Sequence, residues 1–345
     1  MADYKEIAGI KVQSIAGNPS VAVAGQLWYN ATAATVKGNV FYNGVWSTSS
    51  ATMNLGRKMV GSAGSSSNDG VIAGGITLMP SGQQTNQNAT ESFNGTAWTT
   101  GNNINSTRRG LGSAGISGTA ALIMGGYLDP YTTASEKWDG TNWTSTPSLS
   151  SARDSIGGAG TSTSALAISG NQGVSITGGV ESWNGSSWTT GTSSPNIEHL
   201  WQQACGKSNS DVLSWGGASY APPTGYTYYN TCYLWDGSSW TAKNNTLQAS
   251  RARSGKSCTS TTAIVNFGGS PDNTHTEIWD GTSWTAGNAL PIAQGNAGSN
   301  GSGPSSTAAW IGGGDAPAIT SPGDEGYDGT QIYNYGADTV TLASA

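Results

Sequence analysis

The chain has 345 residues, of which 51 are glycine and only 10% are charged, and its formal net charge is −6. The charged share is less than half of the usual ~25%. Low charge with little hydrophobicity suggests disorder, but 14 tryptophans and 13 tyrosines can supply a core, so we expect the chain to fold. The acidic balance and the absence of a Lys/Arg run exclude a nucleic-acid partner, which needs a basic surface.

The chain begins MADYKEIAGIKV, which has no apolar core of a secretion signal, and no run of about 18 apolar residues follows. We therefore expect neither conventional secretion nor membrane insertion. Cys205, Cys232 and Cys258 are odd in number and widely spaced, so they indicate neither a disulfide framework nor a zinc site. We expect three reduced, buried cysteines in a protein made in a cytoplasm.

Residues 1–50 differ from the rest and contain AGQLWYNATAATVKGNVFYNGVW at 24–46. This stretch predicts a β-hairpin without further partner strands. An isolated hairpin is at best marginally stable in water, so its apolar side chains must pack on the rest of the chain or on another chain. The residues expected to make this anchor are Leu27, Trp28, Tyr29, Phe41 and Tyr42.

An aromatic residue, a turn and a second aromatic residue recur along the chain, as in WDGTNW at 138–143. The first aromatic falls at positions 42, 93, 138, 183, 235, 279 and 333, which gives intervals of 44 to 54 residues. This period, without helical periodicity, is typical of β-propeller blades and not of helical solenoids.

Each repeat predicts four strands, which we call a to d. Strand a is the RxxxGSAG segment, as at 57–64, and strand b is an apolar run that ends in two glycines, as in ALIMGG at 121–126. Strand c ends at the first aromatic and strand d begins at the second. The Asx-Gly pair between them favours a tight hairpin, which places the two aromatic side chains opposite each other.

Arginine at the start of strand a and glutamate near the end of strand c occur together in four repeats and are both missing in the other two. The fourth repeat has His199 and Tyr233 at these positions, and the sixth has Pro291 and Gln331. One buried charge without its partner costs about 3–5 kcal/mol, so joint presence predicts an ion pair, inside a blade or between blades. Independent drift among six copies is the alternative. The expected pairs are Arg57 with Glu91, Arg108 with Glu136, Arg153 with Glu181, and Arg251 with Glu277.

These elements together resemble the kelch repeat over about residues 57–334: arginine in strand a, Gly-Gly after strand b, Glu-x-aromatic-Asp in strand c, and tryptophan five residues later. The resemblance implies an all-β, kelch-like β-propeller. The chain departs from the kelch pattern in having no Pro-rich link between strands d and a, much more Ser and Thr, and degenerate third and sixth repeats.

The repeat count favours six blades, because there are six a–b pairs but seven aromatic units. The extra unit at 42–46 either closes the ring or belongs to a separate module. A seven-bladed ring is the alternative, if GQLWYN at 25–30 and the C-terminal TVTLASA complete a blade around it. We divide the chain into an anchoring or closing β segment at 1–50 and a propeller at 51–345.

Motifs that suggest enzyme chemistry have a better explanation as parts of the repeat. The GxGxxG match at 110–115 leads into a strand and not a helix, and SGKS at 254–257 lacks the first glycine of a phosphate loop. His199 and His275 are not paired with a nucleophile, so we expect no enzyme and no cofactor. An acidic cluster could hold Ca²⁺, but we favour a solvated acidic loop. Its members are Asp315, Asp324, Glu325 and Asp328.

The connections between strands b and c vary most in length, and variable loops on a rigid scaffold commonly carry recognition. The long ones are residues 76–89, 218–230 and 314–329. The second contains four tyrosines that suit sugar or protein surfaces, and packing on blades four and five is the alternative. These residues are Tyr220, Tyr226, Tyr228 and Tyr229.

Residues 24–46 also resemble N-terminal β segments of bacteriophage tail and fibre proteins, which dock a receptor-binding or decorative domain to the particle. The resemblance implies a virion structural protein made in the host cytoplasm. Its expected partners are other virion proteins or sibling subunits, and a host-surface glycan or protein. The alternatives are a cellular kelch-type interaction module, a propeller lectin and, last, a sugar-oxidising enzyme.

Overall fold

The computed structural model describes residues 4–7, 10–16, 27–32, 34–41, 44–78, 83–173, 175–195, 199–221, 223–248, 255–269, 274–295, 298–299, 308–315, 328–334 and 337–344. Every regular element in these ranges is a β-strand. The described residues therefore include no helix long and apolar enough to span a membrane. The chain divides into two compact units. One is Trp46–Tyr333, and the other combines Met1–Val45 with Asn334–Ala345.

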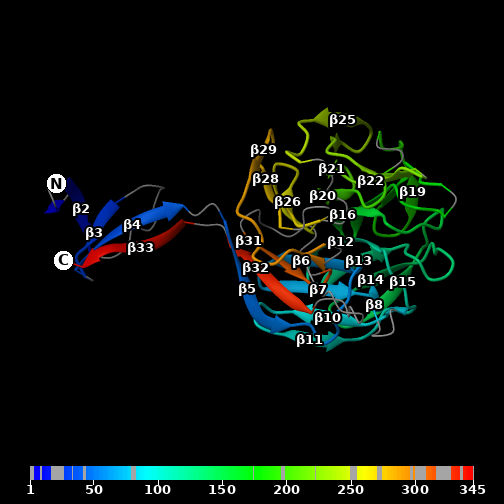
Figure 1. Ribbon diagram of the computed structural model, residues 1–345, viewed down its shortest axis with the longest axis horizontal. Coiled ribbons are helices and arrows are strands. Elements are labelled where there is room, and N and C mark those ends of the chain that lie inside the picture. Colours follow the sequence, from blue (N-terminus) through cyan, green and yellow to red (C-terminus); the bar gives the residue numbers. More distant parts are fainter. Residues whose placement is uncertain are drawn as a thin grey trace. The chain divides into compact units, whose positions relative to one another are not determined.

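The unit Trp46–Tyr333 is a six-bladed β-propeller (Figure 1). The described residues form six four-stranded sheets, whose a strands lie at the centre and contact one another around the ring. The expected all-β, six-bladed fold is therefore confirmed. In the first three blades the strands are β6 (Gly61–Ser66), β7 (Asp69–Ala73), β10 (Thr90–Phe93) and β11 (Trp98–Gly101); β12 (Gly112–Ser117), β13 (Ala120–Met124), β14 (Ser135–Trp138) and β15 (Trp143–Thr146); β16 (Gly157–Thr161), β17 (Ser164–Ile168), β18 (Val180–Trp183) and β19 (Trp188–Thr190).

The other three blades follow the same order along the chain, except at the rim of the sixth. Their strands are β20 (Gln203–Ser208), β21 (Asp211–Trp215), β24 (Cys232–Trp235) and β25 (Trp240–Lys243); β26 (Gly255–Ser260), β27 (Ala263–Phe267), β28 (Thr276–Trp279) and β29 (Trp284–Ala286); β30 (Gly298–Ser299), β31 (Ala308–Gly312), β32 (Gly329–Asn334) and β5 (Val45–Thr52).

The composition of strands a and b follows from their places in the ring. Strand b lies between strands a and c with neighbouring blades on both faces, and four of its five residues are buried in every blade. Strand a comes so close to its neighbour that only small residues fit. A Cβ atom on Gly158 of β16 would collide with the Ser113 carbonyl oxygen of β12. The glycine-rich strand a is therefore a packing requirement.

The turn between strands c and d forms the expected hairpin. In the second blade Trp138 lies opposite Trp143, and their ring centroids are 5.2 Å apart. Asp139 Oδ1 accepts hydrogen bonds from the Thr141 and Asn142 amides at 2.8 and 2.7 Å, which lowers the pKa of Asp139. The other complete c–d pairs have centroid distances of 4.9–5.3 Å; they are Phe93 with Trp98, Trp183 with Trp188, Trp235 with Trp240, and Trp279 with Trp284.

In the first and second blades, the second aromatic of the pair donates a hydrogen bond to the preceding blade. Trp143 Nε1 donates to Thr90 Oγ1 of the first blade at 2.8 Å, and Trp98 Nε1 donates to Thr330 Oγ1 of the sixth at 2.8 Å. The indole thus packs on strand c of its own blade while bonding to strand c of the neighbour. Buried tryptophan commonly combines large apolar area with one hydrogen bond in this way.

The ring is closed by a strand from the N-terminal end of the chain. Strand β5 is the outermost strand of the sixth blade, and its Trp46 lies 5.0 Å from Tyr333 of β32 between ring centroids. Trp46 Nε1 donates to Thr276 Oγ1 of the fifth blade at 3.0 Å. The sixth aromatic pair is therefore divided between the two ends of the propeller sequence, which is why six blades carry seven aromatic motifs.

The unit of Met1–Val45 and Asn334–Ala345 is a five-stranded sheet of its own. Its strand order is β1 (Tyr4–Ile7), β2 (Ile10–Ile15), β3 (Leu27–Asn30), β4 (Thr35–Phe41) and β33 (Ala337–Ser344), with β2 and β3 parallel and the other pairs antiparallel. In Figure 1 the C-terminal β33 lies beside β4. The seven-bladed alternative is therefore wrong, because TVTLASA joins this sheet and no blade.

The unit boundaries also differ from those expected. The boundary at residue 50 falls inside β5, and the C-terminal residues from Asn334 onward leave the propeller. The reason is that β5 pairs with β32 as the outermost strand of the sixth blade, whereas β33 pairs with β4. Of the expected anchor residues, Leu27, Trp28 and Tyr29 lie in β3 and Phe41 ends β4, while Tyr42 lies outside the described residues.

Because Trp46 closes the ring, truncation of its side chain should strongly destabilise the propeller. Trp46→Ala should lower the free energy of unfolding by about 3–5 kcal/mol, because a buried ring and an inter-blade hydrogen bond are lost together. Val45→Ala, at an exposed neighbouring position of the same strand, should change it by less than about 0.5 kcal/mol. Urea unfolding measures both, and equal effects would contradict closure through Trp46.

Candidate functional site

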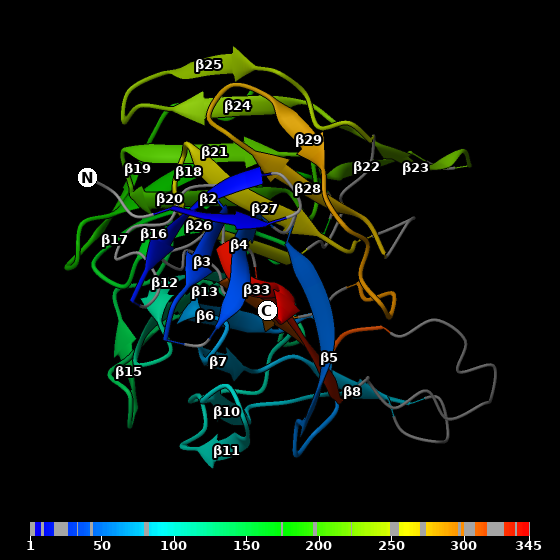
Figure 2. The ribbon, with the colours of Figure 1, turned by 90° about the vertical axis from the view of Figure 1, so that its left-hand side faces the viewer.

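The connections between strands b and c share one end of the propeller, which we call the loop face. The first forms a hairpin of β8 (Ile76–Leu78) and β9 (Gln84–Asn86), and the fourth a hairpin of β22 (Ala218–Ala221) and β23 (Gly225–Tyr228). Figure 2 shows β8 and the β22–β23 hairpin extending to the same side. The loop at 314–329 lies largely outside the described residues.

Beneath the loop face, arginine and glutamate pair inside single blades. Three of the four expected pairs have N–O distances of 2.6–3.0 Å and side chains no more than 3% exposed; they are Arg57 with Glu91, Arg108 with Glu136, and Arg153 with Glu181. Arg251 lies outside the described residues. Its expected partner Glu277 accepts a hydrogen bond from the Gln248 amide and lies 2.5 Å from His275 Nε2.

Each pair joins the start of a blade to its strands b and c. Arg57 donates to the carbonyl oxygens of Gly74 and Ala89, and Glu91 accepts hydrogen bonds from the Asn54 amide and side chain at 2.6 and 3.0 Å. Burial lowers the pKa of Arg57 to about 10, against the opposing effect of Glu91. The guanidinium therefore stays charged at neutral pH, and the pair has a structural role.

The two blades with different residues at these positions use neutral groups instead. In the sixth blade the arginine position is Gln294 and not the expected Pro291, because the Gly269 amide donates to the Gln294 carbonyl as the Gly75 amide does to that of Arg108. Gln331 Nε2 donates to Gln294 Oε1, so two amides replace the two charges. In the fourth blade, His199 Nδ1 lies 3.0 Å from the Gly216 carbonyl oxygen, and its ring stacks on Tyr229.

A series of three backbone hydrogen bonds joins four consecutive blades where their innermost strands begin. The Gly110 amide donates to Met59 O at 2.9 Å, Ser155 to Gly110 O at 2.8 Å, and Trp201 to Ser155 O at 3.2 Å. These residues all have left-handed backbone, with φ between +56° and +65°. Non-glycine residues in this region cost roughly 1–3 kcal/mol each and are found where the surroundings over-determine them, commonly at functional sites.

The expected recognition tyrosines divide into two groups. Tyr220 and Tyr226 are 51% and 48% exposed, and their ring centroids lie 4.9 Å apart. Tyr229 instead follows the packing alternative, since it stacks on His199 at 3.9 Å and its hydroxyl pairs with Ser219 Oγ at 2.9 Å. Tyr228 is half-buried, with its ring centroid 6.3 Å from that of Tyr226.

Trp201 belongs to the same cluster, although sequence reasoning did not select it. Its ring centroid is 5.2 Å from that of Tyr226. Its position in the repeat could have identified it. Two residues after the arginine position, the first three blades have Met59, Gly110 and Ser155, whereas the fourth blade has a large aromatic ring. The loop face of the fourth blade therefore gathers Trp201, Tyr220, Tyr226 and Tyr228, which we call the aromatic cluster.

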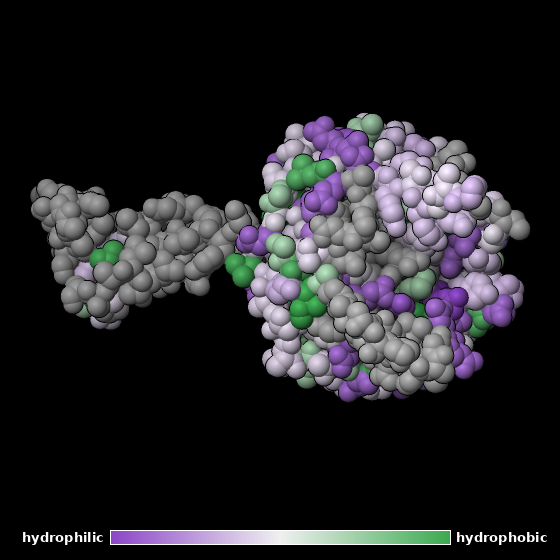
Figure 3. Space-filling model, viewed as in Figure 1, coloured by the Kyte–Doolittle hydropathy of each residue, from purple (hydrophilic) through white to green (hydrophobic). Residues whose placement is uncertain are grey.

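Charged side chains lie on other blades of the loop face. Arg109 lies over the Tyr127 ring at 4.6 Å and donates to Asn86 Oδ1, and Lys58 pairs with Asp315 at 2.6 Å. Among the described residues there is no group of three or more His, Cys, Asp or Glu that could hold a metal, and Asp324 and Glu325 of the acidic cluster lie outside them. Hydrophobic residues on the face in Figure 3 are scattered and form no single large patch.

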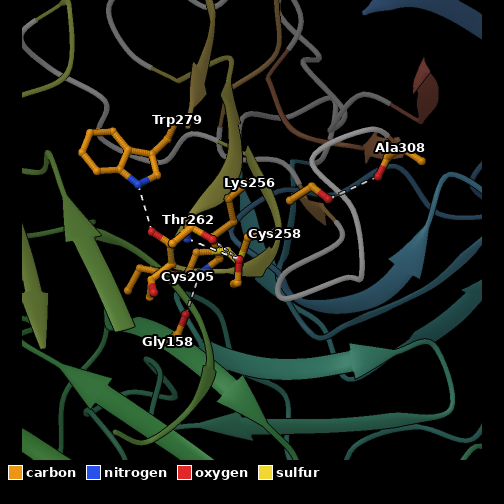
Figure 4. Close-up of a disulfide and its surroundings, with 11 residues drawn as sticks. Gly158, Cys205, Lys256, Cys258, Thr262, Trp279 and Ala308 are labelled. Atoms are coloured by element: carbon orange, nitrogen blue, oxygen red, sulfur yellow. Dashed lines mark hydrogen bonds between the residues drawn. A yellow bond between two sulfur atoms is a disulfide. The ribbon is translucent and has the colours of Figure 1, made fainter. Parts of the chain in front are cut away.

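The innermost strand of the fifth blade, β26, carries a buried lysine. Lys256 of β26 occupies a position where the other innermost strands have small residues, and its Nζ donates to the carbonyl oxygens of Gly158 and Ala204 at 2.5 Å each. It thus ties the fifth blade to the third and fourth (Figure 4). Burial lowers the pKa of Lys256 to about 7. The equivalent residues are Ser62, Ser113, Gly158, Ala204 and Ser299.

The expectation of three reduced cysteines is wrong for two of them. Cys205 of β20 and Cys258 of β26 form a disulfide between adjacent innermost strands, with Cα atoms 6.2 Å apart. Their separation of 53 residues equals about one repeat, so the two cysteines reach neighbouring blades at nearly the same height. Cys232 is free and buried, and burial raises its pKa to about 12.

The buried ion pairs predict a non-additive double mutant. Arg108→Met alone should destabilise the protein by about 3–5 kcal/mol, because it leaves the buried Glu136 charge without its partner. The double variant Arg108→Met with Glu136→Leu should recover a substantial part of that loss, because it removes both charges. Chemical denaturation of the four proteins of the cycle checks this, and additive losses would contradict the coupling.

Lys256 predicts that stability rises with pH above neutrality. The unfolded lysine keeps its proton up to its ordinary pKa near 10.4, whereas the folded one releases it above about 7. Between these values the unfolded state binds more protons, so the free energy of unfolding should gain up to about 1.4 kcal/mol per pH unit. Denaturant unfolding from pH 6 to 9, with the Lys256→Met variant as reference, measures this gain. A constant difference between the two proteins would contradict it.

No protein-family model matches the chain, and no curated protein sequence matches it. Solved structures do resemble it. The structure of YjhT is similar with a TM-score of 0.61 at 12% sequence identity, over 81% of this chain and 95% of that one. At this identity the similarity shows the fold alone, and it agrees with the β-propeller described above.

Proposed function

We propose that the protein is a non-enzymatic structural component of a virus particle, a phage tail, fibre or capsid-decoration protein. The observation that carries the proposal is that both chain ends leave the propeller and form a separate sheet, β1-β2-β3-β4-β33. This unit, which we call the terminal unit, contributes no strand to any blade. Because it does not close the ring, the terminal unit can attach the protein to other virion proteins or sibling subunits.

In this proposal the propeller carries the recognition surface. Its blades are held by buried ion pairs, paired aromatics and backbone hydrogen bonds between four blades, so the loop-face hairpins extend from a rigid base. Rigid scaffolds with variable loops are suited to recognition, here of a host-surface glycan or protein. A kelch-like repeat is part of this proposal. It is supported by the Arg–Glu pairs and by the left-handed Gly74 and Gly75 that end strand b, with φ of +65° and +99°.

A propeller lectin is the second candidate. The exposed Tyr220 and Tyr226 beside Trp201 favour it, because aromatic rings stack on sugar faces. A lectin would not need to join a particle, so assembly separates the two candidates. A cellular kelch-type interaction module likewise would not join a particle.

Removal of the terminal unit tests the proposal. Deleting residues 1–44 together with 335–345 keeps β5 and β32, so the propeller should fold with the thermal midpoint of its full-length parent. The truncated protein should no longer sediment with particles from a lysate of infected cells, whereas the full chain should. A matched control that deletes 1–52 also removes β5 and should fail to unfold cooperatively.

The outcomes separate the possibilities. Sedimentation of the truncated protein with particles would place attachment on the propeller and overturn the role of the terminal unit. A full-length chain that never sediments with particles would overturn the virion proposal and favour the lectin or the cellular module.

A further inference from the structure

We propose that the aromatic cluster of the fourth blade binds a neutral sugar ring, with Trp201, Tyr226 and Tyr220 as its stacking surface. The proposal rests on the proposed function of the loop face as a recognition surface and names its ligand class. Trp201 belongs to the series of backbone hydrogen bonds between blades, and the tyrosines belong to the β22–β23 hairpin.

The geometry leaves aromatic surface open to a ligand. Tyr220 and Tyr226 are about half exposed, whereas the other described aromatic side chains of the propeller are buried or half-buried. The rings of Trp201 and Tyr226 are tilted by 48° to each other, as are those of Tyr220 and Tyr226. Tilted neighbours do not cover each other's faces as stacked rings do. A pyranose, whose faces carry C–H groups and whose edge carries hydroxyls, fits such a surface with tyrosine hydroxyls at its border.

The cluster is held in place before any ligand arrives. The Trp201 amide is bonded to Ser155 O, and the flanking Leu200 exchanges both backbone hydrogen bonds with Ala218, the first residue of β22. Below the cluster, Tyr229 is fixed between His199 and Ser219. Rigid aromatic contacts lose little conformational entropy on binding, which favours recognition of a weakly interacting ligand such as a sugar.

Charge distinguishes a neutral sugar from an anionic one. The described residues of the hairpin, 218–221 and 223–230, include no acidic or basic side chain. An anionic saccharide would be expected to meet arginine or lysine, which form charge-assisted hydrogen bonds to carboxylate and sulfate. The described cations of the loop face are engaged on other blades, Lys58 with Asp315 and Arg109 with Asn86 and Tyr127.

The test measures binding of defined oligosaccharides to the full chain. The probes are cellohexaose, maltohexaose and chitohexaose as neutral sugars, with sialyllactose and a hyaluronan hexamer as anionic ones, and the readouts are calorimetry and tryptophan fluorescence. We expect at least one neutral probe to bind and both anionic probes to fail. Tyr226→Ala should weaken that binding by about tenfold or more, and Tyr226→Phe by no more than about twofold.

A matched control separates this cluster from the rest of the loop face. Tyr127→Ala removes a half-buried tyrosine from the second blade and should leave the sugar affinity unchanged. Because Tyr226 is half exposed, Tyr226→Ala should keep the thermal midpoint, and Trp201→Phe gives a second variant that retains an aromatic ring. Unchanged affinity in Tyr226→Ala, binding of anionic probes only, or binding of no probe would each overturn the proposal.

Failure here is distinguishable from failure of the proposed function. A chain that joins particles through the terminal unit but binds no neutral sugar remains a virion component with a different receptor. A chain that binds a neutral sugar through Tyr226 but joins no particle is a lectin.

Discussion

The aromatic pair at the rim of each blade is the interaction on which the propeller depends. Each pair packs strand c against strand d, and its second indole bonds to the preceding blade where that blade offers a threonine, as in Trp143 to Thr90. A ring of such contacts is stable only when it has no open end. Strand β5 provides the last tryptophan, Trp46, and so converts six similar sheets into one closed body. The aromatic contacts between neighbouring blades therefore depend on this closure.

Inside the ring, the blades differ in how they are locked. Three described blades use a buried arginine and glutamate, which together bind the start of the blade to strands b and c. The fourth blade has a histidine stacked on tyrosine in place of this pair, and it is here that unusual links accumulate. Lys256 and the disulfide from Cys205 to Cys258 both connect it to the fifth blade. These cross-links stabilise a blade that lacks the buried arginine and glutamate.

The same departure creates the surface that we connect with binding. Without the arginine pair, the loop face of the fourth blade carries a hairpin rich in tyrosine and a tryptophan with left-handed backbone, Trp201. A strong scaffold allows such substitutions, because closure and the other blades supply the stability. The terminal unit, built from both chain ends, is a second compact unit. We propose that the terminal unit attaches the protein to the particle and that the loop face of the propeller recognises the ligand.

The sequence alone determined the repeat, its four strands and the ion pairs, because each of these is a local pattern or a correlation between copies. The opposite placement of Trp138 and Trp143 follows from a turn of a few residues, and the pairing of Arg108 with Glu136 from their joint occurrence. Contacts between distant segments left no such pattern. Only the tertiary structure decided that Trp46 completes the sixth blade, that β33 returns to β4, and that Cys205 meets Cys258. Likewise, the stacking of Tyr229 on His199 and the contact of Tyr226 with Trp201 are decided by packing between segments and not by residue type.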